Sequence, residues 1–262
     1  MLAPSEILEK WIVSGKAKAR NSVCKLFLLA VFAGVFIAIA GVGSTIASAA
    51  IENPSAAKLI GACVFPGGLA MCLLAGSELF TGNTLILIPV LSKEASVAGM
   101  LKNWVTVFIG NFVGSILIAL AVNYGGTLGL FGNAAAQSAV NTAAAKVTLT
   151  FSDAFIRGIL CNFLVCIAVW IAAGAQSAGG KLAGLFFPIM IFVLSGYEHS
   201  IANMYYIPAG IIAQNTYPIA GNNALTWGAF LLNNLLPVTL GNILGGGVTV
   251  GVVYTLVYRK KA

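Results

Sequence analysis

The segment GYEHSIAN, residues 196–203, repeats the pattern of the earlier segment GSELFTGN, residues 76–83. Glycine, glutamate and asparagine fall at the same three places in both segments, without a gap. Each segment lies within a long apolar stretch, where an ionisable side chain is costly. We therefore expect two related interruptions of membrane helices, one at Glu78 and one at Glu198.

A second pair of matches follows the first in the same order. Asn103 and the Gly-Asn pair that ends at Asn111 have the same spacing as Asn234 and the Gly-Asn pair that ends at Asn242. Single matches of small residues arise by chance in membrane helices, but two pairs in one order favour an internal repeat. With three helices in each copy, the second copy is inserted upside down, so the sequence predicts inverted repeats.

The composition is typical of a membrane protein. Of the 262 residues, 59% are hydrophobic and 8% are charged, and the mean hydropathy is +0.97. These values lie outside the range of soluble globular proteins. Fourteen basic against seven acidic residues would suit a nucleic-acid-binding protein, but the basic residues form no single patch with interleaved aromatic side chains. We expect no nucleic-acid partner.

Long uncharged stretches predict six spans in the lipid bilayer. A span needs about 20 apolar residues, and the stretches suggest helices near residues 27–49, 59–90, 103–123, 155–177, 183–211 and 229–256. The second and the fifth are over-long, and each contains one of the two glutamates. The predicted fold class is an all-α membrane protein of six transmembrane helices in two inverted three-helix repeats, with helices 2 and 5 broken.

The predicted division of the chain follows these spans. It comprises an N-terminal amphipathic helix at 1–25, a first repeat at 26–125, an external connecting loop at 126–153, a second repeat at 154–257 and a basic tail at 258–262. In the N-terminal helix, one face is apolar, with Ile7, Leu8, Trp11 and Ile12. This face suits a helix on the membrane surface, and a frayed terminus is the alternative.

The distribution of basic residues predicts the orientation. With six spans both termini lie on one side, and that side carries Lys10, Lys16, Lys18, Arg20, Lys25, Lys93, Lys102, Lys181, Arg259, Lys260 and Lys261. Only Lys58, Lys146 and Arg157 fall on the other side. The positive-inside rule therefore predicts that both termini are cytoplasmic. The first 25 residues are too charged for a cleaved signal peptide.

A helix that breaks inside the bilayer leaves backbone groups that lipid cannot satisfy, so both breaks are expected to line a cavity. Glu78 and Glu198 are expected to accept hydrogen bonds from these groups, with Asn83 and Asn203 supporting the same breaks. Direct contact of the glutamates with a substrate is the alternative. The five cysteines show no metal-ligand spacing, and we expect no disulfide, metal site or cofactor.

Three segments resemble the signature segments of the formate/nitrite transporter family, whose members also carry hydrosulfide. They are LAGSELFTGN (74–83), SGYEHSIANMYYIPAG (195–210) and LLPVTLGNILGGG (235–247). The resemblance implies an aquaporin-like six-helix protomer in a homopentamer, with a pore in each protomer. It also implies passive or proton-coupled transport of small monovalent anions across the inner or plasma membrane.

The resemblance also implies roles for individual residues. The central histidine corresponds to His199, the threonine of the LFTG loop to Thr81 and the lysine before the fourth helix to Lys146, with Asn162 and Asn242 holding the polar centre. The hydrophobic constrictions correspond to Phe65, Leu69, Leu79, Phe80 and Phe192. Lys146 would attract the anion, and proton transfer involving His199 would neutralise it, since an unpaired charge is costly at an apolar constriction. Histidine suits this because its ordinary pKa of about 6.5 lies within the working pH range.

Several other interpretations remain open at this stage. Thr81 can cap a half-helix, and by itself Lys146 is an ordinary loop lysine. Arg157 and Asp153 are expected to form ion pairs within the fold or at an interface rather than to line the pore.

Two rival functions fit the sequence less well. An aquaporin-like channel for water or small neutral solutes would carry an Asn-Pro-Ala type box in each half, but the only Asn-Pro is Asn53-Pro54. An intramembrane hydrolase would need Ser195 or Ser200 beside His199, but neighbouring residues on a helix point about 100° apart. We expect no enzyme activity.

Overall fold

The computed structural model describes residues 1–259, and helices form nearly all of this range. Within these described residues, five helices are long and apolar enough to cross a membrane, namely Val23–Ser48, Pro54–Gly76, Val97–Tyr124, Phe151–Gly174 and Trp227–Tyr258. Two shorter apolar helices are Phe80–Leu91 and Ala178–Leu194. The chain is therefore a multi-pass membrane protein. Lys260, Lys261 and the end of the predicted basic tail lie outside the described residues.

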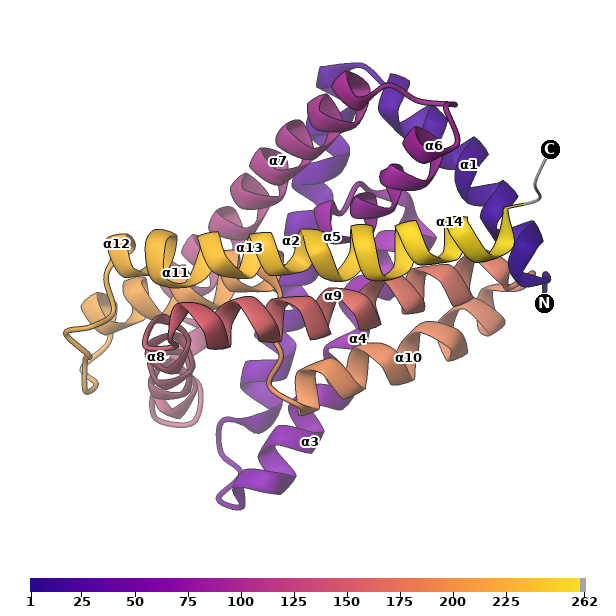
Figure 1. Ribbon diagram of the computed structural model, residues 1–262. Coiled ribbons are helices and arrows are strands. Elements are labelled where there is room, and N and C mark those ends of the chain that lie inside the picture. The colour runs from indigo at the N-terminus through magenta and orange to yellow at the C-terminus, as the bar shows by residue number, and fades with distance from the viewer. Residues whose placement is uncertain (260–262) are drawn as a thin grey trace.

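Figure 1 shows α1 and α14 at one end of the molecule and α8 and α12 at the other. The first part of the chain contains α1 (Pro4–Arg20), α2 (Val23–Ser48), α3 (Pro54–Val64), α4 (Pro66–Met71), η1 (Cys72–Gly76), α5 (Phe80–Asn83), η2 (Thr84–Ile86), α6 (Leu87–Leu91) and α7 (Val97–Tyr124). The later part contains η3 (Thr127–Gly129), α8 (Ala134–Val147), α9 (Phe151–Gly174), α10 (Ala178–Leu194), α11 (Ser200–Thr216), α12 (Trp227–Ala229), η4 (Phe230–Leu235), α13 (Leu236–Ile243), η5 (Leu244–Val252) and α14 (Val253–Tyr258).

Two helix pairs form the framework. The helices α2 and α7 pack along each other, and α9 packs along α13 and η5. Glycine allows both close approaches, because a Cβ atom at Gly114 would overlap the Val31 carbonyl oxygen and one at Gly245 would overlap that of Ile159. In lipid, such backbone contacts replace the hydrophobic driving force that holds soluble helices together.

The structure interrupts helices at both glutamates. Residues 77–79 separate η1 from α5, and a turn at 195–196 followed by the extended residues 197–199 separates α10 from α11. We call the segments 77–79 and 197–199 the first and the second break. The residues Gly76 (φ 85°) and Gly196 (φ 69°) adopt the left-handed conformation just before each break, which glycine reaches without a steric penalty.

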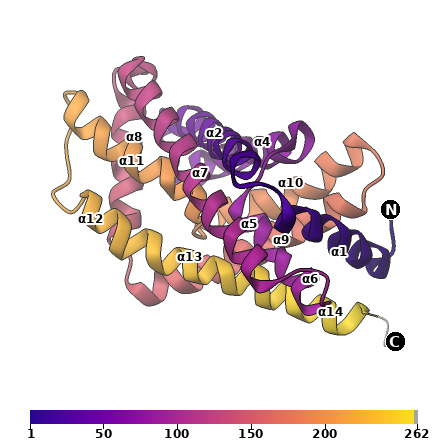
Figure 2. The same ribbon diagram turned by 90° about the horizontal axis from the view of Figure 1, so that it is seen from above.

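The connecting segment predicted as a loop, residues 126–153, contains the helix α8, and Figure 2 places α8 beside α11. Seven of the fourteen residues of α8 are alanines, and alanine has the highest helix propensity. Its small face packs closely on α11, where a Cβ atom at Gly210 would lie 2.5 Å from that of Ala143. The alanine-rich sequence offers little contrast between polar and apolar faces, so periodicity did not reveal the helix.

The N-terminal helix α1 packs its apolar face against the rest of the chain. The side chains of Ile7, Leu8 and Trp11 are buried, and α1 contacts α6, η2, α7, α9 and α14. Polar contacts also hold it, since the Lys10 ammonium donates to the Ala173 carbonyl oxygen (2.8 Å) and Lys16 pairs with Glu94 (2.6 Å). The apolar face that predicted a helix on the membrane surface thus covers other helices of the same chain.

Acidification should loosen the contact between α1 and the loop after α6. The Lys16 ammonium holds the pKa of the Glu94 carboxyl below its ordinary value of 4.5. The pair therefore stabilises the docked helix above pH 4.5, and this contribution is lost as the pH falls through the lowered pKa. At pH 7, Glu94→Gln should speed amide hydrogen exchange in α1 by about two- to fivefold, and once acid has protonated the Glu94 carboxyl the variant and the wild type should exchange alike. Glu52→Gln, in the exposed segment before α3, is the control, and equal exchange at pH 7 would show that the pair does not hold α1.

Candidate functional site

His199, at the end of the second break, meets Thr81, which lies on α5 just after the first break, and both are buried. His199 is the N-cap of α11, and the Ala202 backbone N–H donates to its Nδ1 (3.0 Å). Because a backbone N–H can only donate, Nδ1 is the acceptor and a neutral ring carries its proton on Nε2. This nitrogen lies 3.1 Å from the Thr81 hydroxyl oxygen. The ring therefore donates to Thr81, whose own hydrogen is free to point elsewhere.

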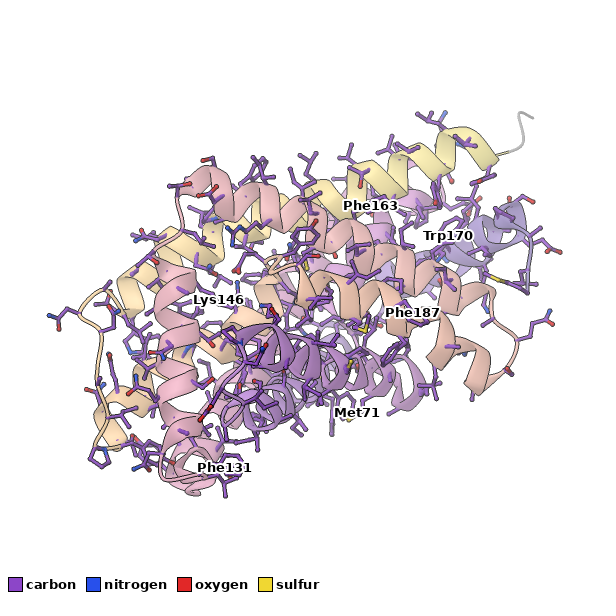
Figure 3. All side chains as sticks on the ribbon, turned by 90° about the horizontal axis from the view of Figure 1, so that it is seen from below. Met71, Phe131, Lys146, Phe163, Trp170 and Phe187 are labelled. Carbon is purple, nitrogen blue, oxygen red and sulfur yellow. The ribbon has the colours of Figure 1, made fainter. Side chains whose placement is uncertain are left out.

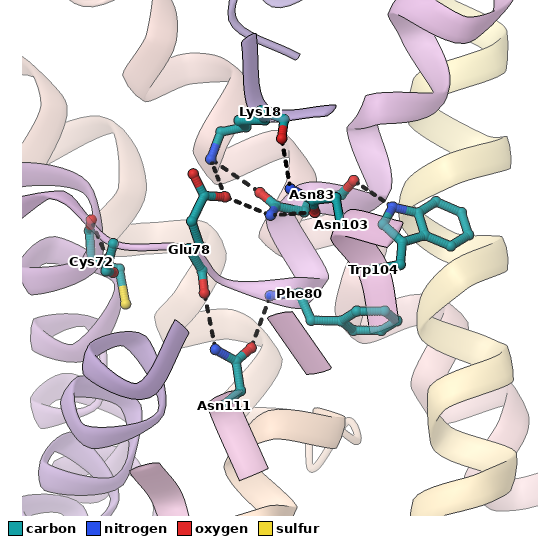
Figure 4. Close-up of polar contacts among 9 residues, drawn as sticks. Lys18, Cys72, Glu78, Phe80, Asn83, Asn103, Trp104 and Asn111 are labelled. Carbon is teal, nitrogen blue, oxygen red and sulfur yellow. Dashed lines mark hydrogen bonds and ion pairs between the residues drawn. The ribbon is translucent and has the colours of Figure 1, made fainter. Parts of the chain in front are cut away.

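One asparagine bridges the two sides of each break. In the first break, the Asn111 amide nitrogen donates to the Glu78 carbonyl oxygen (2.9 Å), and the Phe80 N–H donates to the Asn111 amide oxygen (3.0 Å), as Figure 4 shows. In the second break, Asn242 makes the same two contacts with the Glu198 carbonyl oxygen (3.0 Å) and the Ser200 N–H (2.9 Å). These bonds satisfy backbone groups that a lipid environment would leave unpaired.

Each glutamate side chain is paired with a lysine and an asparagine. Glu78 accepts from Lys18 (2.7 Å) and Asn83 (2.6 Å), also drawn in Figure 4. Glu198 accepts from Lys146 (2.8 Å) and Asn203 (2.7 Å). A buried carboxylate persists only when such partners offset its lost hydration.

A further asparagine completes each set. The Asn83 amide nitrogen donates to the amide oxygen of Asn103 (2.9 Å), and that of Asn203 donates to the amide oxygen of Asn234 (2.7 Å). The amide nitrogens of Asn103 and Asn234 in turn donate to the carbonyl oxygens of Lys18 (3.2 Å) and Lys146 (3.0 Å). The two networks therefore match residue for residue.

Asn162 on α9 links the polar centre to a neighbouring helix. Its amide nitrogen donates to the carbonyl oxygens of Thr81 (3.2 Å) and Asn242 (2.6 Å) and to the Thr84 hydroxyl (3.2 Å). The structure thus brings together four predicted residues, His199, Thr81, Asn162 and Asn242. The fifth predicted residue, Lys146, is connected to these four through Glu198. Its ammonium pairs with the Glu198 carboxylate, and the Glu198 carbonyl oxygen accepts from Asn242.

A cavity of about 320 Å³ opens toward this centre, and we call it the α8 vestibule. Its lining includes Lys58, Lys146, Arg157, Glu198, His199, Phe65 and Phe192. Figure 3 shows Lys146 among the helices that surround the α8 vestibule, whereas the labelled Phe163 and Phe187 lie on the outside of the bundle. The Lys146 ammonium also lies 5.7 Å from the centre of the Tyr206 ring.

The predicted constriction residues are all buried but lie in different surroundings. Phe65 and Phe192 pack edge to face with ring centres 5.7 Å apart, and the Phe192 ring lies 5.8 Å from that of His199. Phe80 instead packs against Phe108 of α7 (5.1 Å). Leu69 lies on α4, and Leu79 is the N-cap of α5. An aromatic pair therefore lies directly beside the imidazole at the inner end of the α8 vestibule.

Comparison with known proteins places the chain in a family. A family model described as "Formate/nitrite transporter" matches residues 5–256. The chain belongs to the formate/nitrite transporter family.

Relatives of this formate/nitrite transporter family member are named as transporters and channels. It is 37% identical to a probable formate transporter of Methanothermobacter thermautotrophicus, over 99% of this chain and 98% of the relative. It is 36% identical to the formate channel FocA of Escherichia coli K12, over 100% and 96% of the two chains. A solved structure described as a pentameric formate channel with formate bound matches with a TM-score of 0.84 at 38% identity, over 91% of this chain and 98% of that one.

Lys18 of this family member is a site residue that the sequence patterns did not identify. This lysine lies on α1, 60 residues before Glu78, whereas Lys146 lies 52 residues before Glu198. Because these separations differ and Lys10, Lys16, Lys25 and Lys58 also precede Glu78, the ungapped repeat cannot be extended to Lys18. The separations are too long for any helical periodicity to link a lysine to its carboxylate.

One expected ion pair of this family member is absent from residues 1–259. The Asp153 carboxylate accepts from the Thr150 hydroxyl (2.7 Å), while Arg157 lines the α8 vestibule. The predicted pairing of Arg157 and Asp153 within the fold is therefore not found in this range, and ion pairing at an interface stays a prediction.

The hydrolase alternative for this family member receives no support from the geometry. In the described part of the chain, neither Ser195 nor Ser200 donates to His199, whose two ring nitrogens contact Ala202 and Thr81. The Asn53-Pro54 pair, which was considered for the aquaporin-like alternative, has a local structural role. The Asn53 side chain caps α3 by accepting from the Ala56 N–H (3.0 Å).

Proposed function

We propose that this chain is a channel or transporter for small monovalent anions, with formate as its main substrate. The single observation that carries the proposal is the His199–Thr81 contact, which lies where the two breaks meet and beside the Phe65–Phe192 pair. The names of the relatives support formate, while nitrite and hydrosulfide are further candidates. The similarity to a pentameric formate channel supports a homopentamer with a pathway in each protomer.

We propose six spans in two inverted repeats for the membrane topology. The matching networks around Glu78 and Glu198 support this arrangement, because lysine, glutamate and three asparagines occupy equivalent places in each. An odd number of spans between equivalent residues would relate the networks by inversion. Both termini would then lie in the cytoplasm, in agreement with the positive-inside rule.

Transport begins with attraction of the anion by Lys146 in this proposal. The ammonium raises the local anion concentration beside His199, but the anion cannot cross the Phe65–Phe192 pair cheaply while it is charged. The Nε2–H of His199 polarises the Thr81 hydroxyl, which can donate a hydrogen bond to the arriving anion. Neutralisation needs one proton, which enters through the His199–Thr81 pair or through water and is released after the neutral acid has crossed.

The hydrogen bond at Nδ1 constrains how His199 takes part. A second proton on the ring must sit on Nδ1, and it would displace the Ala202 N–H that caps α11. Donation of a proton by a doubly protonated ring therefore requires loss of this capping hydrogen bond. Relay of a proton through a neutral ring keeps it. Both routes require a group that can exchange protons at position 199.

Formate flux in protein-containing liposomes tests the function, and His199→Asn tests the mechanism. The wild type should conduct formate above protein-free liposomes, with a flux that changes strongly between about pH 5 and 8. Asparagine is a good N-cap, so the variant should remain folded and assembled but lose most of this pH dependence. Ser195→Ala is the control.

Each outcome bears on a separate part of the proposal. An unchanged pH profile in His199→Asn would remove the histidine from proton exchange and leave anion transport standing. A wild-type protein that conducts water but no formate would instead favour the aquaporin-like alternative.

A further inference from the structure

Two cationic side chains in the α8 vestibule have no carboxylate partner. The residues 1–259 contain three ion pairs, Lys16–Glu94, Lys18–Glu78 and Lys146–Glu198. Lys58 on α3 and Arg157 on α9 belong to none of them, although both line the cavity. Cations that only solubilise a surface would not need to gather around one cavity.

The α8 vestibule carries an excess of positive charge. Its charged lining consists of three cations, Lys58, Lys146 and Arg157, and one carboxylate, Glu198. That carboxylate lies 2.8 Å from Lys146 and is also bound to Asn203 and Asn234. Two positive charges therefore remain without compensation, and they come from helices separate from the one that carries Lys146.

The charges are close enough to act together. Lys58, Lys146, Arg157 and Glu198 line one cavity of about 320 Å³, so their charges act on the same small volume. Hydroxyls line the same cavity, since Ser138 and Thr142 of α8 share a helix face with Lys146 at intervals of four residues. An anion entering this cavity meets cations and hydrogen-bond donors before it reaches His199.

The chemistry of these groups suits a small oxyanion or carboxylate. A planar guanidinium can offer two parallel N–H groups to a carboxylate, whereas an ammonium acts as a compact point charge. A cleft lined by one sign of charge, with low-dielectric walls, concentrates counter-ions. The Arg157 and Lys58 side chains together supply both features.

We propose that Lys58 and Arg157 form an anion-recruiting site in the α8 vestibule, ahead of Lys146, that sets the permeability for small monovalent carboxylates and oxyanions. This inference rests on the proposed function, because it assumes that anions cross the protein. It assigns a role to two residues outside the His199–Thr81 centre and outside both glutamate networks. Because the two charges act through space, their effect must depend on ionic strength.

Formate flux at two ionic strengths tests the recruiting site. At about 10 mM salt, where the Debye length is about 30 Å, the double variant Lys58→Gln/Arg157→Gln should conduct about three- to tenfold less than the wild type. At about 1 M salt, where the Debye length is about 3 Å, the difference should shrink to less than about twofold. The charge-preserving variant Lys58→Arg/Arg157→Lys should keep most of the flux at low salt.

A matched control separates local from overall charge. The double variant Lys25→Gln/Lys181→Gln removes the same charge from residues outside the lining of the α8 vestibule and should conduct like the wild type at both salt concentrations. The single variants Lys58→Gln and Lys58→Glu keep the test possible if the double variant misfolds, because Lys58 is exposed and its replacement should not disturb the fold. Flux at low salt should fall in the order wild type, Lys58→Gln, Lys58→Glu.

The outcomes distinguish this inference from the proposed function. No formate flux in the wild type would overturn the proposed function. Wild-type flux that the Lys58 and Arg157 variants leave unchanged at low salt would overturn the recruiting site alone. A loss that persists at 1 M salt would also overturn it, because it would indicate a structural defect rather than an electrostatic effect.

Discussion

Lys146→Glu is expected to abolish nearly all formate flux. The Lys146 ammonium lies 2.8 Å from Glu198 and its side chain is only 16% exposed. Reversal of its charge places a second carboxylate beside a buried one, and loss of one partner from a buried ion pair costs about 3–5 kcal/mol. The same change turns attraction of an anion into repulsion of several kcal/mol at an effective dielectric of about 20.

Two companion variants separate charge from assembly. Lys146→Arg keeps the charge and should keep much of the flux. The swapped variant Lys146→Glu/Glu198→Lys restores a pair and should recover pentamer formation, measured by size exclusion, more fully than it recovers flux.

Ionic strength provides the decisive comparison for Lys146. A lysine in open water would interact with an anion by about 1 kcal/mol or less, so its loss would matter little at high salt. Charge reversal of the partly buried Lys146 should instead lower the flux at both low and high salt, because ions screen a partly buried pair poorly. Near-wild-type transport by a correctly assembled Lys146→Glu protein would remove this residue from the pathway.

Asn242→Leu is expected to have the largest effect on stability. The Asn242 side chain is fully buried, donates to the carbonyl oxygens of Gly158 (2.8 Å) and Glu198 (3.0 Å), and accepts from the Ser200 N–H (2.9 Å). Leucine has a similar size but leaves the Glu198 carbonyl oxygen and the Ser200 N–H unpaired, and it removes the second hydrogen bond of the Gly158 carbonyl oxygen, which lies within α9. Each buried unpaired group costs about 1–3 kcal/mol, so the thermal midpoint in detergent should fall by roughly 10 °C or more.

The neighbouring Asn233 supplies the matched control, because its side chain is exposed. Asn233→Leu should leave the midpoint nearly unchanged. Asn111→Leu should match Asn242→Leu, because Asn111 makes the equivalent bonds to Ala30 (2.8 Å), Glu78 (2.9 Å) and Phe80 (3.0 Å). A mild effect of Asn242→Leu together with a normal pentamer would mean that water or a neighbouring group satisfies the second break.

Sequence patterns alone located the two breaks because the relevant signals are local. Glycine, glutamate and asparagine recur within eight residues at Gly76 and Gly196, and each residue type has a separate physical reason to be there. Glycine adopts the left-handed conformation, and the carboxylate and the amide hydrogen-bond each other across five residues, as Glu78 and Asn83 do (2.6 Å). The apolar stretches around them identify membrane helices for an equally local reason, because a helix in lipid must be apolar over its whole length.

Only the tertiary structure decided which residues meet across the chain. Asp153 and Arg157 are four residues apart on α9, a spacing that allows an ion pair, yet Arg157 lines the α8 vestibule because α9 presents it there. The pairing of Lys18 with Glu78 and of Lys146 with Glu198 depends on how α1 and α8 pack against the broken helices. Sequence patterns determined where the helices break, because backbone conformation and burial are local properties. The folded structure determined how charge is distributed around the breaks, because Coulomb interactions and hydrogen bonds depend on distance in space and not on separation along the chain.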